Sequence, residues 1–448
     1  MTKTQFRQIS TVGDVAITYG TQLLLVLVKF GTGVLTARLL GATGKGVYVL
    51  AFYIPGILST LGNLAIGQSL IYRLRRQELS PQQMFVAVLI PVVLISALII
   101  GAYWLLLPLL QATTLRDVDP DLATLTILVV PVMLLSNYVS NVFRGLGRIL
   151  IYNLFNITKY GLVLIGLVTG FIFLGTTAQD ATYATLAAYA AIALVLLAAL
   201  FAASYPLASS LPARELINTT KLGLKYHTVQ VLSFMEYRFD VLVLATLLPP
   251  DQVGIYSVAV TIAQLPWLIS HSLGTVLFPK VISLSPESAA QFTGTVIRNS
   301  VALHLLAVLG LALFGYPIIS LAYGAEFQTS YFVFLLLGPG IVVNALFRVT
   351  SSYFSGIGQP LTTARVSFGT LIANILLNVL LIPSMGIFGA ALASLITYSA
   401  SGIVMFVIFI QHTGLPWQRT LLVQKSDWRR YKKLANGLLA VGLRGATV

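Results

Sequence analysis

Long apolar segments, separated by short polar stretches, follow one another along most of the chain. Each is long enough to form a helix that crosses a hydrocarbon layer of about 30 Å, which takes about 20 residues. The segments lie at 14–37, 47–71, 84–110, 122–143, 150–174, 182–205, 226–248, 254–278, 299–321, 329–354, 360–382 and 386–411. The pattern predicts an all-α polytopic membrane protein with about twelve transmembrane helices.

The composition excludes an ordinary soluble protein. Of 448 residues, 57% are hydrophobic and 9% are charged, against roughly 25% charged residues in soluble domains. The first thirteen residues are largely polar and lead into a full-length apolar segment, so we expect no cleavable signal peptide. The chain has no cysteine, and its four histidines lack metal-ligand spacing. We therefore expect no metal site, no cofactor and no catalytic residues.

The basic residues predict an orientation in the membrane. A net charge of +14 would suggest nucleic acid in a soluble protein. Here, with the amino terminus taken as cytoplasmic, inner segments hold 20 Lys and Arg residues and outer loops hold three. This bias follows the positive-inside rule. We expect a bacterial inner (plasma) membrane protein with both termini in the cytoplasm and no nucleic-acid partner.

The chain repeats a motif at half its length. Leu39-Leu40, five residues, then Gly46-Val47-Tyr48 is matched by Leu247-Leu248, five residues, then Gly254-Ile255-Tyr256, at an offset of 208. Six helices per half is an even number, so the two halves would insert in the same direction. Such repeats are related by an axis along the membrane normal. The predicted parts are two six-helix lobes at 1–205 and 226–411, a cytoplasmic linker at 206–225, and a basic cytoplasmic or interfacial tail at 412–448.

These motifs resemble those of a known superfamily. They are 37–41 with Gly46-Val47-Tyr48, its echo at 254–256, the turns at Gly145/Gly147 and Gly356/Gly358, and the junction 382–394. In order and spacing the sequence is similar to the polysaccharide or oligosaccharide flippase branch of the multidrug/oligosaccharidyl-lipid/polysaccharide exporter superfamily. The resemblance runs from about residue 10 to 411. It implies a two-lobed, V-shaped molecule that moves a lipid-linked sugar intermediate across the inner membrane.

Apart from residues in the terminal turns of a span, such as Arg365, six charged residues lie inside predicted spans: Lys29, Lys159, Arg238, Glu236, Asp240 and Arg348. Each costs about 2.5–3.5 kcal/mol at a helix centre, so it is expected to face the bundle interior or a wet cavity. Arg238 lies about midway along its span, and the other three basic residues are nearer to the membrane surface. Their long side chains could reach the headgroups instead.

The candidate substrate-binding residues combine these cations with amides that share their helix faces. They are Arg238, Arg348, Lys29, Lys159, Asn344 and Asn137. Glu236 and Asp240 are four residues apart and share a face nearly opposite Arg238, so they are candidates for structural ion pairs. Two alternatives stay open. Arg238 could itself belong to a structural ion pair, and the asparagines could join helices by hydrogen bonds.

The excess of two positive charges among these residues suits an anionic headgroup, because Arg and Lys bind phosphate oxygens. We predict a monomeric, non-enzymatic flippase that carries a polyprenyl-diphosphate-linked oligosaccharide by alternating access. Its other expected partners are membrane lipids and a coupling proton or sodium ion. One alternative is a cation-coupled multidrug exporter of the same fold, which would carry unpaired carboxylates in its cavity. A membrane glycosyltransferase or polymerase is remote, since the longest outer loop, 111–121, is short.

Overall fold

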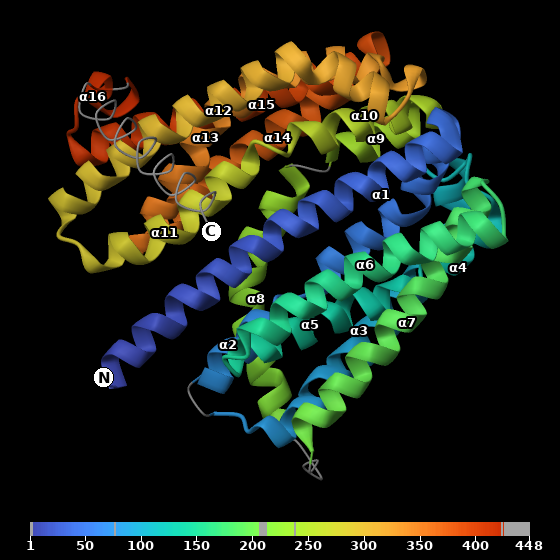
Figure 1. The fold of residues 1–448 in the computed structure, drawn as a ribbon, viewed down its shortest axis with the longest axis horizontal. Helices are drawn as coiled ribbons and strands as arrows, with labels where there is room; N and C mark the ends of the chain where they lie inside the picture. The colour runs from blue at the N-terminus through green and yellow to red at the C-terminus, as the bar shows by residue number, and fades with distance from the viewer. Residues whose placement is uncertain (1–2, 76–77, 206–212, 237–238, 423, 425–448) are drawn as a thin grey trace, which may run out of the picture. The chain divides into compact units, whose positions relative to one another are not determined.

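The computed structural model describes residues 3–75, 78–205, 213–236, 239–422 and 424, and every regular element in these ranges is a helix (Figure 1). The all-α prediction is confirmed. The elements are α1 (Lys3–Gly62), α2 (Ile66–Arg75), η1 (Pro81–Gln83), α3 (Met84–Ala112), α4 (Pro120–Thr126), α5 (Val129–Gly145), α6 (Ile149–Phe173), α7 (Ala178–Ser204), α8 (Ala213–Glu236), α9 (Phe239–Leu247), α10 (Pro250–Ala263), α11 (Trp267–Ser283), α12 (Pro286–Ala322), η2 (Ala325–Phe327), α13 (Thr329–Gly356), α14 (Pro360–Met385), α15 (Ile387–Thr413) and α16 (Trp417–Leu421).

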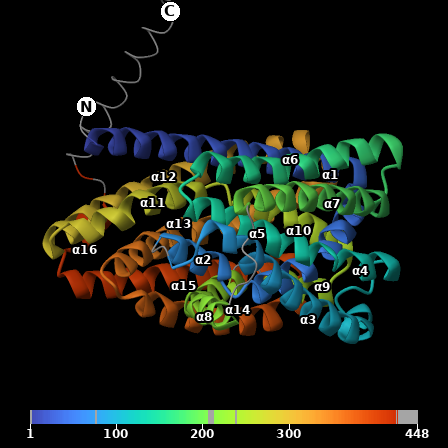
Figure 2. The same cartoon turned by 90° about the horizontal axis from the view of Figure 1, so that it is seen from below.

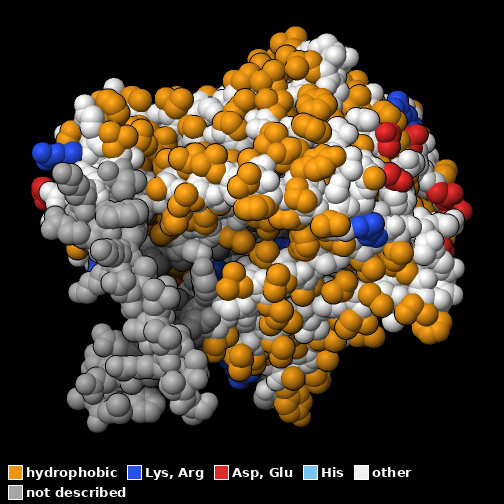
Figure 3. All heavy atoms as spheres, turned by 45° about the horizontal axis from the view of Figure 1, so that its top comes forward, with side chains coloured by type: hydrophobic (Ala, Val, Ile, Leu, Met, Phe, Trp, Pro, Cys, Tyr) orange, Lys and Arg blue, Asp and Glu red, His pale blue; other side chains and the backbone are white. Residues whose placement is uncertain are grey.

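The described residues contain nine helices long and apolar enough to cross a membrane, or ten if α10 and the start of α11 form one bent span. The chain is therefore a multi-pass membrane protein. The number twelve stays a prediction, partly because α1 is counted once although it covers the first predicted span and much of the second. Figure 3 shows hydrophobic side chains over most of the face it draws, with few charges among them. The outward residues Leu98, Leu105 and Leu313 are 74%, 81% and 72% exposed, as expected for side chains that face lipid.

A sharp bend divides α1 at Gly41, whose φ of 66° and ψ of −176° are not helical. Glycine adopts positive φ without a steric penalty. Beyond the bend, the buried Lys45 donates from Nζ to the Gly33 carbonyl oxygen at 3.2 Å and to the Thr36 hydroxyl at 2.9 Å. In a straight helix, residues twelve apart would be about 18 Å apart. The chain must therefore turn back on itself here, between the first two predicted spans.

Contacts along the chain divide it into two compact units. Unit 1 holds 1–261, 316–333 and 374–390, and unit 2 holds 262–315, 334–373 and 391–448. Within unit 1, α6 lies along α7 and α1, and α2 packs on α5 and α8 (Figures 1 and 2). The predicted lobe boundaries are a different division of the chain and stay a prediction.

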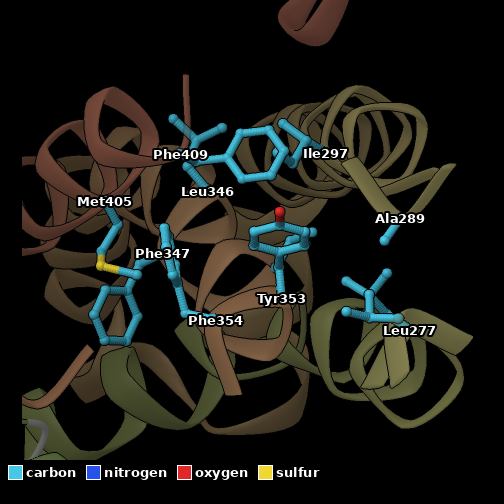
Figure 4. Packing of buried hydrophobic residues seen from close by; sticks show 11 residues of the cluster. Leu277, Ala289, Ile297, Leu346, Phe347, Tyr353, Phe354, Met405 and Phe409 are labelled. Atoms are coloured by element: carbon cyan, nitrogen blue, oxygen red, sulfur yellow. The ribbon is translucent and has the colours of Figure 1, made fainter. Parts of the chain in front are cut away.

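The core of unit 2 is a cluster of buried apolar side chains from α11, α12, α13 and α15 (Figure 4). The Tyr353 ring lies 5.0 Å from the Phe409 ring and 5.4 Å from the Phe354 ring, both edge to face. Edge-to-face pairs stabilise by about 0.5–1.5 kcal/mol beyond area burial. The contact between Tyr353 and Phe409 holds α13 against α15 and so positions the polar residues that α13 carries.

The repeated motif forms a reciprocal helix contact within unit 1. A Cβ atom built on Gly46 would lie 1.7 Å from the Pro250 carbonyl oxygen, and one on Gly254 would lie 2.2 Å from the Ala42 carbonyl oxygen. Each glycine thus faces the carbonyl four residues before the other glycine. Small residues allow membrane helices to approach this closely. Such a reciprocal contact is expected of two segments related by a two-fold axis, which supports the predicted duplication.

Candidate functional site

A polar cavity of about 490 Å³ lies within unit 1, at the meeting of α1, α2, α5, α6 and α7. Its walls carry five amides, four aliphatic hydroxyl groups, three tyrosines and one lysine. These are Asn63, Gln68, Asn137, Asn141 and Asn156; Ser59, Thr60, Ser136 and Ser140; Tyr152, Tyr160 and Tyr189; and Lys159. None of the described lining residues is Asp or Glu. A membrane protein keeps so many polar groups at one place chiefly where they face a cavity.

Two lysines meet at one tyrosine beside this cavity. Lys159 Nζ of α6 lies 5.1 Å from the centroid of the Tyr160 ring, and Lys29 Nζ of α1 lies 4.3 Å from the same centroid. Lys159 is half-buried and Lys29 is exposed. The ring attracts each ammonium group, but the two like charges repel each other. An anion bound within reach of both ammonium groups would offset that repulsion, and phosphate oxygens are suitable partners for lysine.

Asn137 lines the cavity next to Asn141 on the same face of α5. Asn141 Nδ2 donates to the Asn137 carbonyl oxygen at 2.9 Å and to Asn137 Oδ1 at 3.1 Å. Gly67 of α2 faces this pair, and a Cβ atom there would lie 2.4 Å from Asn141 Nδ2. Glycine at this position therefore lets α2 approach α5 without displacing the Asn141 amide.

An aromatic cavity of about 460 Å³ adjoins the polar one, with which it shares Gly56, Thr60 and Tyr189. Its other walls include the rings of Tyr48, Phe52, Tyr53 and Phe234. The Tyr48 and Thr185 hydroxyl groups are hydrogen-bonded at 3.0 Å. Together the two cavities offer amides and hydroxyl groups on one side and ring faces on the other.

A second group of candidates lies in unit 2. The Arg348 guanidinium lies 4.2 Å from the Trp267 ring centroid, and its Nε donates to Asn344 Oδ1 at 3.2 Å. The buried Asn344 in turn donates from Nδ2 to the Ser401 hydroxyl at 3.2 Å. Arg348 and Asn344 are therefore members of one polar network that joins α11, α13 and α15. Their proposed role in binding stays a prediction.

The remaining candidates are clustered around helix α9. Arg238 lies outside the described residues, as does the side chain of Glu236. Asp240 is buried; its Oδ2 accepts from the Tyr256 hydroxyl of α10 and its Oδ1 from the Val241 N–H at 2.8 Å. The carboxylate thus contacts a neighbouring helix, and its predicted ion pair stays a prediction.

Sequence reasoning brought Lys29, Lys159 and Asn137 forward one at a time, and the structure places all three at or beside one cavity. It missed Asn63, Gln68 and Asn156. Asn137 was chosen because it is an amide inside a predicted apolar segment, and the same criterion would have selected these three residues. The tyrosines carried no signal, because aromatic residues are common throughout the apolar segments.

Comparison with known proteins identifies the family. A family model described as "Polysaccharide biosynthesis protein" matches residues 12–285, which cover the polar cavity. The chain belongs to this polysaccharide biosynthesis protein family.

Two curated relatives of this family member come from Haloferax volcanii. One is named "Probable low-salt glycan biosynthesis flippase Agl15" and is 27% identical over 197 residues, which are 43% of this chain and 41% of the relative. The other, "Probable flippase AglR", is 26% identical over 187 residues, or 40% of this chain and 39% of the relative. The chain spans about two fifths of the length of the curated relatives it matches.

Solved structures show which fold this family member shares. The lipid II flippase MurJ in an inward closed conformation superposes with a TM-score of 0.75 at 14% identity, over 90% of this chain and 89% of MurJ. A multidrug resistance MATE transporter of the MOP superfamily, in an inward-facing conformation, gives a TM-score of 0.70 at 18% identity, over 89% of this chain and 98% of the transporter. The fold is therefore that of the superfamily predicted from the motifs.

Proposed function

We propose that this chain is a flippase that moves a polyprenyl-diphosphate-linked oligosaccharide from the inner to the outer leaflet of the plasma membrane by alternating access. The observation that carries the proposal is the polar cavity of unit 1, with Lys159 in its wall and Lys29 at the same tyrosine. An amide-rich, cationic cavity suits sugars joined to a diphosphate. Family membership and the names of the flippase relatives support the same substrate class.

The proposal includes the topology and the absence of catalysis. The excess of basic residues on one side supports cytoplasmic termini in the plasma membrane. The relatives are named as flippases and transporters, which supports transport without chemical change. A coupling ion and a monomeric state are also part of the proposal.

The test uses the purified full-length chain in liposomes with a fluorescent polyprenyl-diphosphate disaccharide, whose outer-leaflet fraction is measured with a membrane-impermeant quencher. Lys159→Met is expected to slow translocation about tenfold, the effect of losing one hydrogen bond to a charged group. Lys159→Arg keeps the charge and is expected to retain most activity. Lys221→Met, an exposed residue of α8 that does not line the cavity, is the matched control.

A cation-coupled multidrug exporter is the second candidate, favoured by the MATE-like fold. The two candidates differ in the charge that the cavity must hold. An exporter of cations needs carboxylates, and the described walls of the polar cavity carry a lysine instead. Transport of a cationic dye by the liposomes, with no movement of the lipid-linked disaccharide, would replace the flippase proposal with the exporter.

A further inference from the structure

An irregular segment connects α1 and α2 at the wall of the polar cavity. Helix α1 ends at Gly62 and α2 begins at Ile66, and between them Leu64 and Ala65 have φ of 47° and 48°. They are the two non-glycine residues with positive φ in the described part of the chain. Residues with side chains avoid this conformation, and such strain is concentrated at functional sites. The segment is held in place by the Tyr138 hydroxyl, which donates to the Asn63 carbonyl oxygen at 2.7 Å.

The break places two hydrogen-bond acceptors in the cavity wall. Asn63 precedes the strained pair and Gln68 lies in the first turn of α2, and both line the polar cavity. Asn63 is 94% buried, and neither its Oδ1 atom nor Gln68 Oε1 has a hydrogen-bond donor among the described residues. Buried acceptors are normally paired, so each unpaired one calls for an explanation. Both oxygens are themselves enclosed by the wall, so each amide must rotate toward the cavity to accept from a ligand that brings donors.

The rest of the cavity narrows the chemistry of that ligand. Ser59, Ser140 and Asn156 offer groups that can donate as well as accept, so the ligand must carry donors and acceptors close together. A sugar ring does so, because each hydroxyl group both donates and accepts. The adjoining aromatic cavity offers Tyr53 and Tyr189 to the apolar faces of such rings. Both volumes, about 490 and 460 Å³, are typical of small-molecule sites.

We propose that the cavity at the α1–α2 break is a glycan subsite, in which Asn63 and Gln68 accept hydrogen bonds from hydroxyl groups of the sugars next to the diphosphate. The inference rests on the proposed function, because it assigns the two parts of one substrate to two sets of residues. Lys29 and Lys159 bind the negatively charged diphosphate, and the amides of Asn63 and Gln68 form hydrogen bonds with the sugar. Affinity for the sugar therefore depends on the amides, whereas affinity for the diphosphate does not.

The experiment measures binding of two kinds of probe to the purified full-length chain. One is farnesyl diphosphate, and the others are farnesyl diphosphate joined to glucose, N-acetylglucosamine or glucuronic acid. The wild-type chain is expected to bind at least one sugar-bearing probe about tenfold more tightly than farnesyl diphosphate. Asn63→Leu and Gln68→Met, which keep the approximate side-chain volume, are expected to remove that gain and leave farnesyl diphosphate binding unchanged. Gln179→Met, an exposed residue of α7 outside the cavity, is the control.

The outcomes separate the subsite from the proposed function. Unchanged binding of farnesyl diphosphate shows that a variant is folded. If both variants keep the preference for a sugar-bearing probe, the subsite is wrong and the flippase proposal stands. If the wild-type chain binds no sugar-bearing probe more tightly than farnesyl diphosphate, the subsite is also wrong. If it neither binds nor translocates any of the probes, the proposed function itself fails.

Discussion

Alanine at Gly46 or Gly254 is expected to disrupt the contact between α1 and α10. The added Cβ atom would lie 1.7 Å from the Pro250 carbonyl oxygen in the first variant and 2.2 Å from the Ala42 carbonyl oxygen in the second. Ordinary contact begins at 3.4 Å, so Gly46→Ala requires the two backbones to separate by about 1.7 Å. Both neighbours are backbone atoms, which cannot move aside as a flexible side chain can.

The expected cost follows from the size of the clash. Overpacking of this kind destabilises by about 1–3 kcal/mol, occasionally more. Alanine also favours a helix over glycine by about 0.8–1 kcal/mol, which offsets part of that loss. Because the clash at Gly46 involves a carbonyl oxygen at 1.7 Å, we expect a net loss of about 2 kcal/mol there and less at Gly254.

The double variant Gly46→Ala/Gly254→Ala tests the reciprocal contact more specifically than either single variant. Both substitutions push the same two helices apart, so the separation caused by the first accommodates part of the second. The loss in Gly46→Ala/Gly254→Ala is therefore expected to be about 1 kcal/mol smaller than the sum of the single losses. The measurement is unfolding of the purified full-length chain in mixed micelles with increasing denaturing detergent.

Gly31→Ala is the matched control, because Gly31 is also in α1 and a Cβ atom there has no neighbour within 4 Å among the described residues. It is expected to leave stability unchanged or to raise it by up to about 1 kcal/mol. The close contact would be refuted if Gly46→Ala were as stable as this control. Strictly additive losses in the double variant would refute the reciprocal geometry.

Two further substitutions test hydrogen bonds that join distant segments of unit 1. The buried Arg73 of α2 donates from Nη1 to the Glu215 carbonyl oxygen at 2.8 Å and to the Thr219 hydroxyl at 2.6 Å, and its Nη2 pairs with the Glu215 carboxylate. Lysine cannot reproduce this fork, so Arg73→Lys is expected to lower stability by about 2 kcal/mol in the same unfolding assay. Arg38 donates from Nε to the Ala322 carbonyl oxygen at 2.9 Å, at the C-terminal end of α12. Arg38→Met is expected to remove about 1 kcal/mol there, seen as roughly fivefold faster amide hydrogen exchange around 320–328, and unchanged exchange would refute the capping role.

Most of the helical fold could be predicted because apolar segment length is set directly by the thickness of the membrane. The bend in α1 was harder to predict, since 36 glycines occur in the chain and only the structure shows that Gly41 has a non-helical backbone. The repeat was visible as a pair of motifs. The repeat did not predict that the segments around Gly46 and Gly254 are in contact. A sequence repeat indicates that two segments have the same local structure, but it does not indicate how far apart they are.

The sequence predicted individual residues of the candidate site, but it did not predict that they lie together in space. Lys29 and Lys159 stood out because each costs energy inside an apolar segment. Their meeting at Tyr160 depends on the packing of α1 against α6, which no local pattern encodes. Asn63 and Gln68 escaped notice for a similar reason. The break that brings them into the wall occurs at Leu64 and Ala65, which are neither glycine nor proline, and the flanking Gly62 and Gly67 are two of 36 glycines in the chain.

Helix α8 contacts both ends of α2, which forms part of the wall of the polar cavity. A Cβ atom on Gly223 of α8 would lie 2.4 Å from the Leu64 carbonyl oxygen, so α8 packs directly on the strained break. The same helix holds the far end of α2 through the hydrogen bonds between Arg73 and Glu215. Helix α2, with Gln68 near its start, is thus fixed to α8 at both ends. Because α8 packs on this wall, a displacement of α8 would change the wall directly. Helix α8 also leads along the chain to the second copy of the repeated motif, in α10. A ligand held by Asn63 and Gln68 would in turn favour one position of α8, since binding and displacement are linked reciprocally.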